Sequence, residues 1–193
     1  MPLQQSSQYS NNFNNQQGGG EKKKRNFIVG GLYATGGRVE VSTWRSEKGG
    51  YYVILTIKSE IGKDPSTGAG VYQNKMSSEL PSVLFNVDTA RALIDSVRSQ
   101  DINNINIVLD TGRGSKITCT GNATSIKVTV DNSAKGSATV TFDAVPTGVS
   151  NVHAGFLNLI ELIEIGFKKA LRNRTDPEEF SSTSNESDDE APF

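Results

Sequence analysis

Aromatic and basic side chains recur together along the first strand-like segments of the chain. Arg38 and Trp44 fall on one face of an alternating segment, and Tyr52 and Lys58 share one face of the segment that follows it. Flat rings can stack on bases and cations can follow a phosphate backbone, so these residue types together predict a surface for single-stranded nucleic acid. The full set of candidate DNA contacts is Arg38, Trp44, Arg45, Lys48, Tyr52, Lys58, Lys63, Tyr72, Lys75, Arg113, Lys116 and Lys127.

Charge divides the chain unequally. Residues 174–193 hold seven acidic residues against Arg174, a net charge of −6, whereas the rest holds 19 basic and 14 acidic residues, a net charge of +5. A mildly basic body suits a polyanionic partner, and an acidic tail does not. We therefore expect a flexible Gln/Asn/Gly-rich arm with a basic cluster at 1–25, a binding domain at 26–173 and a disordered acidic tail at 174–193.

The tail ends in a short motif that combines several acids with an apolar anchor. Its candidate partner-binding residues are Asp188, Asp189, Glu190, Pro192 and Phe193. This motif resembles the C-terminal tip of bacterial and phage single-stranded-DNA-binding proteins, in which acids precede a terminal Pro-Phe. The resemblance implies that the tip docks into replication or recombination proteins, which bury the phenyl ring and hold the acids with basic side chains. Ala191 departs from the bulkier apolar residue of the best-known tips.

The first half of the folded part predicts four strands followed by a helix. Apolar alternation and turn residues place the strands at 27–33, 38–45, 51–58 and 71–76, with a loop at 61–70. A helix then follows to residue 99. Asn86 or Asp88 is expected to cap it, and the stripe of apolar residues is Ala90, Leu93, Ile94 and Val97.

The second half repeats this order without obvious sequence identity. Strands are expected at 105–110, 115–120, 124–131 and 138–145, and a helix at 154–172. The helix has a wide apolar face that must be buried against the sheets or against another subunit, so a homo-oligomer is expected. The residues of this face are Phe156, Leu157, Leu159, Ile160, Leu162, Ile163, Phe167 and Leu171.

Hairpins with a helix after each sheet predict an α+β fold of antiparallel sheets. Four strands and a helix, occurring twice, resemble the Whirly proteins, and a single dimerised unit resembles the transcriptional positive cofactor four family. Both resemblances imply single-strand binding by antiparallel sheets. The alternative is an OB-fold barrel, which needs five strands and one helix.

Catalytic and metal-binding patterns are missing from the sequence. It has no phosphate-binding loop and no dinucleotide fingerprint, and Cys119 and His153 are the sole residues of their types. We expect Cys119 in the core, His153 at the surface or capping the last helix, and Glu161 and Glu164 on its solvated stripe. The chain is therefore expected to be no enzyme and to need no cofactor or metal. With no membrane-spanning run or signal peptide, a cytoplasmic protein is expected, in a bacterium or in a phage host.

Two further functions remain open from the sequence. A transcription cofactor that binds melted promoter DNA would have a similar body, but it would prefer a specific promoter sequence. A scaffold whose acidic tail only solubilises it would ignore single-stranded DNA.

Deletion of residues 188–193 tests the role of the acidic motif. We expect DNA affinity to stay equal or to rise, because the acids can compete with DNA for the basic body, while partner binding is lost. Fluorescence anisotropy with labelled poly-dT measures the first effect, and pull-down of replication proteins measures the second. Weaker DNA binding by the truncated chain would contradict the assignment.

Overall fold

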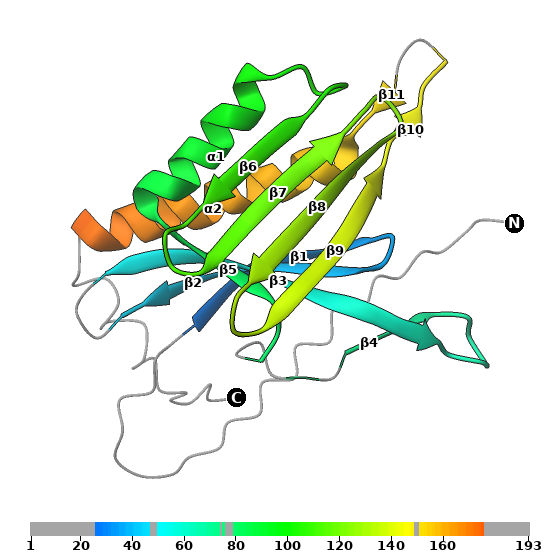
Figure 1. The fold of residues 1–193 in the computed structure, drawn as a ribbon, viewed down its shortest axis with the longest axis horizontal. Helices are drawn as coiled ribbons and strands as arrows, with labels where there is room; N and C mark the ends of the chain where they lie inside the picture. The colour runs from blue at the N-terminus through cyan, green and yellow to red at the C-terminus, as the bar shows by residue number, and fades with distance from the viewer. Residues whose placement is uncertain (1–25, 47–49, 74, 76–78, 149–150, 176–193) are drawn as a thin grey trace, which may run out of the picture.

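The fold consists of two antiparallel sheets and two helices, with a small additional hairpin (Figure 1). The structure is a computed structural model, and it describes residues 26–46, 50–73, 75, 79–148 and 151–175. The α+β prediction of antiparallel sheets with two helices is therefore confirmed. The described strands form separate sheets and not the single closed barrel of the OB-fold alternative.

The first sheet has three long strands, and two short strands share the fourth position beside the third strand. In chain order its strands are β1 (Asn26–Ala34), β2 (Gly37–Arg45), β3 (Tyr51–Lys63), β4 (Gly70–Tyr72) and β5 (Ser82–Asn86). Both β4 and β5 pair with β3 in the same antiparallel direction, with Tyr72 opposite Glu60 and Ser82 opposite Thr56. They therefore follow one edge of β3 in succession.

This edge corrects two expectations from the sequence. The loop predicted at 61–70 begins later, because β3 continues to Lys63, and the strand predicted at 71–76 ends at Tyr72. A further strand, β5, was not predicted from the sequence; it is short and leads directly into the first helix. Figure 1 shows the β3–β4 ribbon extending away from the rest of the molecule.

The second sheet is a regular four-stranded meander. Its strands are β6 (Asn106–Asp110), β7 (Ser115–Gly121), β8 (Ser125–Asn132) and β9 (Gly136–Asp143). The order agrees with the sequence analysis, although the last strand begins and ends two residues before its predicted bounds. The hairpin of β10 (Val145–Pro146) and β11 (Asn151–Val152) follows it.

The first helix, α1 (Val87–Ser99), begins where the sequence predicts. The Asn86 side chain accepts a hydrogen bond of 2.7 Å from the backbone N–H of Thr89 and satisfies one free donor of the first turn. The predicted apolar stripe of α1 is buried, and Arg98 in its last turn forms an ion pair with Glu164 of the second helix.

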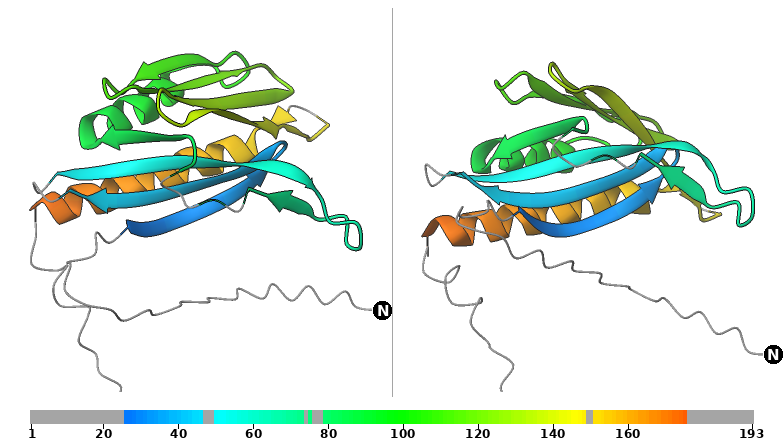
Figure 2. Two further views of the ribbon diagram at one scale, coloured as in Figure 1. Left: turned by 60° about the horizontal axis from the view of Figure 1, so that its bottom comes forward. Right: turned by 90° about the horizontal axis from the view of Figure 1, so that it is seen from below.

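The second helix, α2 (Ala154–Thr175), lies against β1, β2 and β3 and contacts α1 (Figure 2). Two glycines let its backbone come close to the sheet. A Cβ added at Gly30 would lie 2.8 Å from a methyl carbon of Leu162, and one added at Gly166 would lie 3.3 Å from a methyl carbon of Val53. A larger residue at either position would require these side chains to shift.

Most of the predicted apolar face of α2 is buried, as expected. The buried residues are Phe156, Leu159, Ile160, Ile163 and Phe167. Leu157 and Leu171 are wrong members of this face, because they are 46% and 40% exposed, and Leu162 is only partly buried. An apolar residue at helical spacing is thus buried only where a strand or helix lies opposite it.

Strand alternation gives the first sheet two faces. We call the inner face the one that carries Val39, Val41 and Val53, because these side chains pack towards α2 in the core. The opposite, outer face carries Arg38, Trp44 and their partners on the neighbouring strands. The core helices and the second sheet lie to one side of the first sheet (Figure 2). The inner faces of both sheets therefore form the core, and the outer faces are directed away from it.

Asn86→Ala tests the capping contact. Loss of the side-chain acceptor leaves the Thr89 N–H without its partner, so the free energy of unfolding should fall by about 1 kcal/mol. Urea unfolding followed by circular dichroism measures this change. The matched control is Asn86→Asp, which keeps a capping oxygen and adds a negative charge at the helix N-terminus. Equal destabilisation by both variants would contradict the cap.

Candidate nucleic-acid interface

The outer face of the first sheet is organised in rows of directly opposed residues. The strand register places Trp44 beside Tyr52 at one end of β2, and Arg38 beside Lys58 at the other end. These four residues were predicted to share faces in pairs, and the structure brings both pairs onto one face. The rows are Trp44, Tyr52 and Asn86; Ile28, Ser42, Ile54 and Leu84; Gly31, Glu40, Thr56 and Ser82; and Tyr33, Arg38 and Lys58.

One end of this face holds an aromatic pair with a cation above it. The Trp44 and Tyr52 ring centroids are 5.4 Å apart, and their planes are inclined by 30°. The Arg113 guanidinium lies 4.7 Å from the Tyr52 ring centroid, and one of its terminal nitrogens donates a 3.0 Å hydrogen bond to the Tyr52 hydroxyl. We call these three residues the Trp44 cluster. It combines a stacking surface with a cation and therefore suits a nucleotide.

Arg113 reaches the Trp44 cluster from the second sheet. It sits in the β6–β7 turn between Gly112 and Gly114, whose φ angles of 68° and 69° are in the left-handed region. Glycine adopts this region without the steric cost that a Cβ brings. The turn is also held by a 2.7 Å hydrogen bond from the Gly112 N–H to the Asp110 side chain. The turn position of Arg113 was predicted from the sequence, whereas its contact with Tyr52 was not.

The other end of the face holds a second aromatic pair with its own arginine. The Tyr33 and Tyr72 ring centroids are 5.5 Å apart, and the Arg38 guanidinium lies 5.4 Å from the Tyr33 ring centroid. We call these residues the Tyr33 cluster. Tyr72 and Arg38 were predicted as contacts, whereas Tyr33 was missed.

A β-bulge explains why Tyr33 was missed. The register between β1 and β2 shifts between Ile28 and Gly30, so the faces of β1 change over at this point. Simple alternation puts Ile28 and Tyr33 on opposite faces, but the bulge puts both on the outer face. The paired glycines at Gly30 and Gly31 were the available signal, because glycine inside a strand often marks a bulge.

Three charged side chains lie at the Tyr33 cluster and in the row next to it. The Lys58 amino group lies 2.9 Å from a carboxylate oxygen of Glu40, and a guanidinium nitrogen of Arg38 lies 4.0 Å from the other oxygen. The Arg38 side chain is 35% exposed, that of Lys58 is 23% exposed and that of Glu40 is 13% exposed. Arg38 and Lys58 are thus accessible cations that share one carboxylate.

The remaining candidates from the first half lie apart from these clusters. Arg45 is on the opposite face from Trp44, where its guanidinium lies 5.4 Å from the Tyr51 ring centroid. Lys63 is exposed at the end of β3, and Lys75 is exposed between β4 and β5. Lys48 lies outside the described residues, as do the five candidate residues of the acidic tip.

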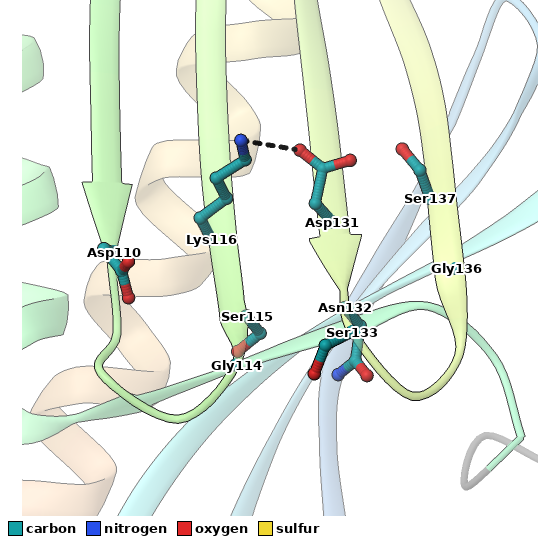
Figure 3. Close-up of a pocket in the computed structure, with 9 residues that line it drawn as sticks. All are labelled: Asp110, Gly114, Ser115, Lys116, Asp131, Asn132, Ser133, Gly136 and Ser137. Atoms are coloured by element: carbon teal, nitrogen blue, oxygen red, sulfur yellow. Dashed lines mark ion pairs between the residues drawn. The ribbon is translucent and has the colours of Figure 1, made fainter.

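The outer face of the second sheet has a different chemistry. Its lysines share the face with threonines, as predicted, but the Lys116 amino group lies 3.7 Å from Asp131 (Figure 3). This pair borders a shallow hollow of about 410 Å³ at the β6–β7 and β8–β9 turns. Lys127 is exposed, and in the described strands of this sheet the single aromatic residue, Phe142, is buried. The face therefore lacks rings for stacking, and Asp110 and Asp131 offset its cations.

The cysteine and the histidine are both buried. Cys119 is in the core as predicted, and desolvation raises the pKa of its thiol to about 12, so the reactive thiolate is suppressed at neutral pH. His153 is 2% exposed, so the expectation of a surface position is wrong; it directly precedes α2, where its carbonyl accepts a 2.9 Å hydrogen bond from the Leu157 N–H. Among the described residues no three or more His, Cys, Asp or Glu side chains are grouped to hold a metal ion.

Comparison of the chain with protein families, with curated proteins and with solved structures found no match. The case for a function therefore depends on the residues and geometry given above. In the described part of the chain, neither helix has the length and apolar character needed to cross a bilayer.

A double-mutant cycle between Arg113 and Tyr52 tests the contact between the two sheets. The free energies of unfolding of Arg113→Ala, Tyr52→Ala and the double variant should show a coupling of about 0.5–1 kcal/mol, as expected for an exposed cation–π contact. Urea unfolding provides the measurement. The control cycle pairs Arg113→Ala with Tyr72→Ala, whose ring belongs to the other cluster and should show additive effects. Additivity in the first cycle would contradict the contact.

Proposed function

We propose that this protein binds single-stranded DNA, without catalysis and largely without sequence preference, through the outer face of its first sheet. The observation that carries the proposal is the presence of two aromatic clusters, each with its own arginine, on the same face. They lie at opposite ends of β2, where the six residue steps from Arg38 to Trp44 correspond to about 20 Å of strand. One DNA strand lying along β2 and β3 can therefore contact both clusters.

The chemistry of the face favours a single strand over a duplex. In a duplex the base faces are stacked on one another, so they are not available to exposed rings. In a single strand every base has a free π-face, and stacking on Trp44 or Tyr33 tolerates any sequence. Between the clusters the row containing Ile28, Ile54 and Leu84 offers apolar contact for further bases.

The cations of the face supply the salt-sensitive part of the binding. Arg113, Arg38 and Lys58 are placed beside or between the rings, where the phosphates of a stacked strand would run. Each phosphate contact releases counterions from the DNA, so affinity should fall as salt rises, with a slope near −0.7 per contact.

The details of the fold support the same proposal. Since β4 and β5 share one edge of β3, each main sheet offers four strand positions and is followed by a helix. We propose that this is the Whirly-like arrangement expected from the sequence, in which antiparallel sheets bind single strands.

Partner recruitment and self-association complete the proposal. The acidic segment 188–193 would attach replication, recombination or repair proteins to the coated strand, as its resemblance to known tips implies. Exposed apolar side chains on α2, among them Leu157 and Ile165, support a homo-oligomer because burial in a subunit contact would remove them from water.

Fluorescence anisotropy of labelled poly-dT and of a duplex of equal length tests the function. The expected result is salt-sensitive binding of the single strand well above the duplex. Equal binding to poly-dT and mixed-sequence strands supports a general binder, whereas preference for one promoter sequence supports the transcription cofactor instead. No preference for the single strand would overturn the proposal.

Trp44→Ala and Tyr52→Ala should each weaken poly-dT binding by about 1–3 kcal/mol, because each removes a stacking surface. The same anisotropy titration measures the loss. The control is Val108→Ala, which truncates a side chain that is 62% exposed on the second sheet. Circular dichroism confirms that the variants are folded. Equal affinities for the control and the two aromatic variants would place the binding surface elsewhere.

A further inference from the structure

Glu40 occupies an unexpected position for an interface that receives phosphates. It lies in the middle of β2 on the outer face, in the row between the apolar row and the Arg38–Lys58 row. Its neighbours across the strands are Gly31 and Thr56, so no cation is directly opposite it. Its side chain is nevertheless only 13% exposed, and its carboxylate lies beside the Arg38 and Lys58 side chains of the adjacent row.

The Glu40 carboxylate lies close to both cations, Arg38 and Lys58. Arg38 and Lys58 are directly opposed across β2 and β3, and two like charges in such a pair repel each other. Glu40 offsets this repulsion through contacts of 2.9 Å to Lys58 and 4.0 Å to Arg38. In the free protein these two cations are therefore partly neutralised by a group that belongs to the same face.

We propose that Glu40 is an internal competitor for the DNA backbone, which lowers the affinity of the outer face and keeps the bound strand exchangeable. This inference rests on the proposed function. The Glu40 carboxylate competes with an approaching phosphate for the Lys58 amino group and repels the phosphate charge, so part of the attraction between lysine and phosphate is offset. Removal of the carboxylate frees the cation and should strengthen binding.

The chain contains a closely matched control for this effect. Lys116 and Asp131 are directly opposed across β7 and β8 on the outer face of the second sheet, with their charged groups 3.7 Å apart, whereas Glu40 and Lys58 are in adjacent rows. Glu40→Gln and Asp131→Asn each replace a lysine-bound carboxylate by its amide and change the net charge equally. Their difference therefore measures the position of the carboxylate and not the total charge of the protein.

The experiment measures poly-dT affinity of the full chain by anisotropy at several salt concentrations. One additional phosphate contact steepens the slope of log affinity against log salt by about 0.7. The gain in affinity over wild type should therefore be about fivefold larger at 0.1 M salt than at 1 M salt. Glu40→Gln should show both changes, and Asp131→Asn should show neither. In a background that carries Arg38→Gln and Lys58→Gln, the gain from Glu40→Gln should disappear, because no cation remains to be released.

The outcomes separate this inference from the function on which it rests. Wild-type protein that binds poly-dT while Glu40→Gln binds equally or more weakly overturns the competitor role, and leaves Glu40 as a residue that positions Arg38 and Lys58. Wild-type protein that fails to bind overturns the proposed function itself. Glu40→Thr, which removes the charge and suits a strand, repeats the measurement if the amide variant does not fold.

Discussion

The close packing of α2 on the inner face of the first sheet determines which side chains of this sheet reach the surface. Apolar side chains from β2 and β3 are buried against this helix, and Gly30 and Gly166 let the two backbones approach. Because a strand alternates its side chains, filling one face with core residues sends the others outward. Arg38, Trp44, Tyr52 and Lys58 reach the surface as a direct consequence of this burial.

The two sheets show how similar backbones acquire different surfaces. Both bury alternating Val and Ile residues on the inside, and both present lysine on the outside. The first sheet adds rings at both ends of its outer face, whereas the second adds threonines and carboxylates, such as Asp131 beside Lys116. Stacking surfaces and cations coincide on the first sheet, so the two kinds of contact that a single strand offers can be made at once.

Sequence patterns predicted the elements well wherever the pattern was regular. The meander of β6 to β9 and the cap at Asn86 follow from alternation and local hydrogen bonding, and the structure confirms them. Local patterns failed where distant segments decide the outcome. The bulge in β1 reverses the face of Tyr33, and the approach of Arg113 to Tyr52 joins residues 61 positions apart. Leu157 follows the helical period but is 46% exposed among the described residues.

Arg113 couples the packing of the two sheets to any binding at the Trp44 cluster. Its turn belongs to the second sheet, yet its guanidinium covers a ring of the first. A ligand that draws Arg113 towards itself therefore acts on the packing of the sheets, and a change in that packing must act equally on the ligand's affinity. Through this one side chain the second sheet, which has no rings exposed on its described strands, is coupled to the binding proposed for the first sheet.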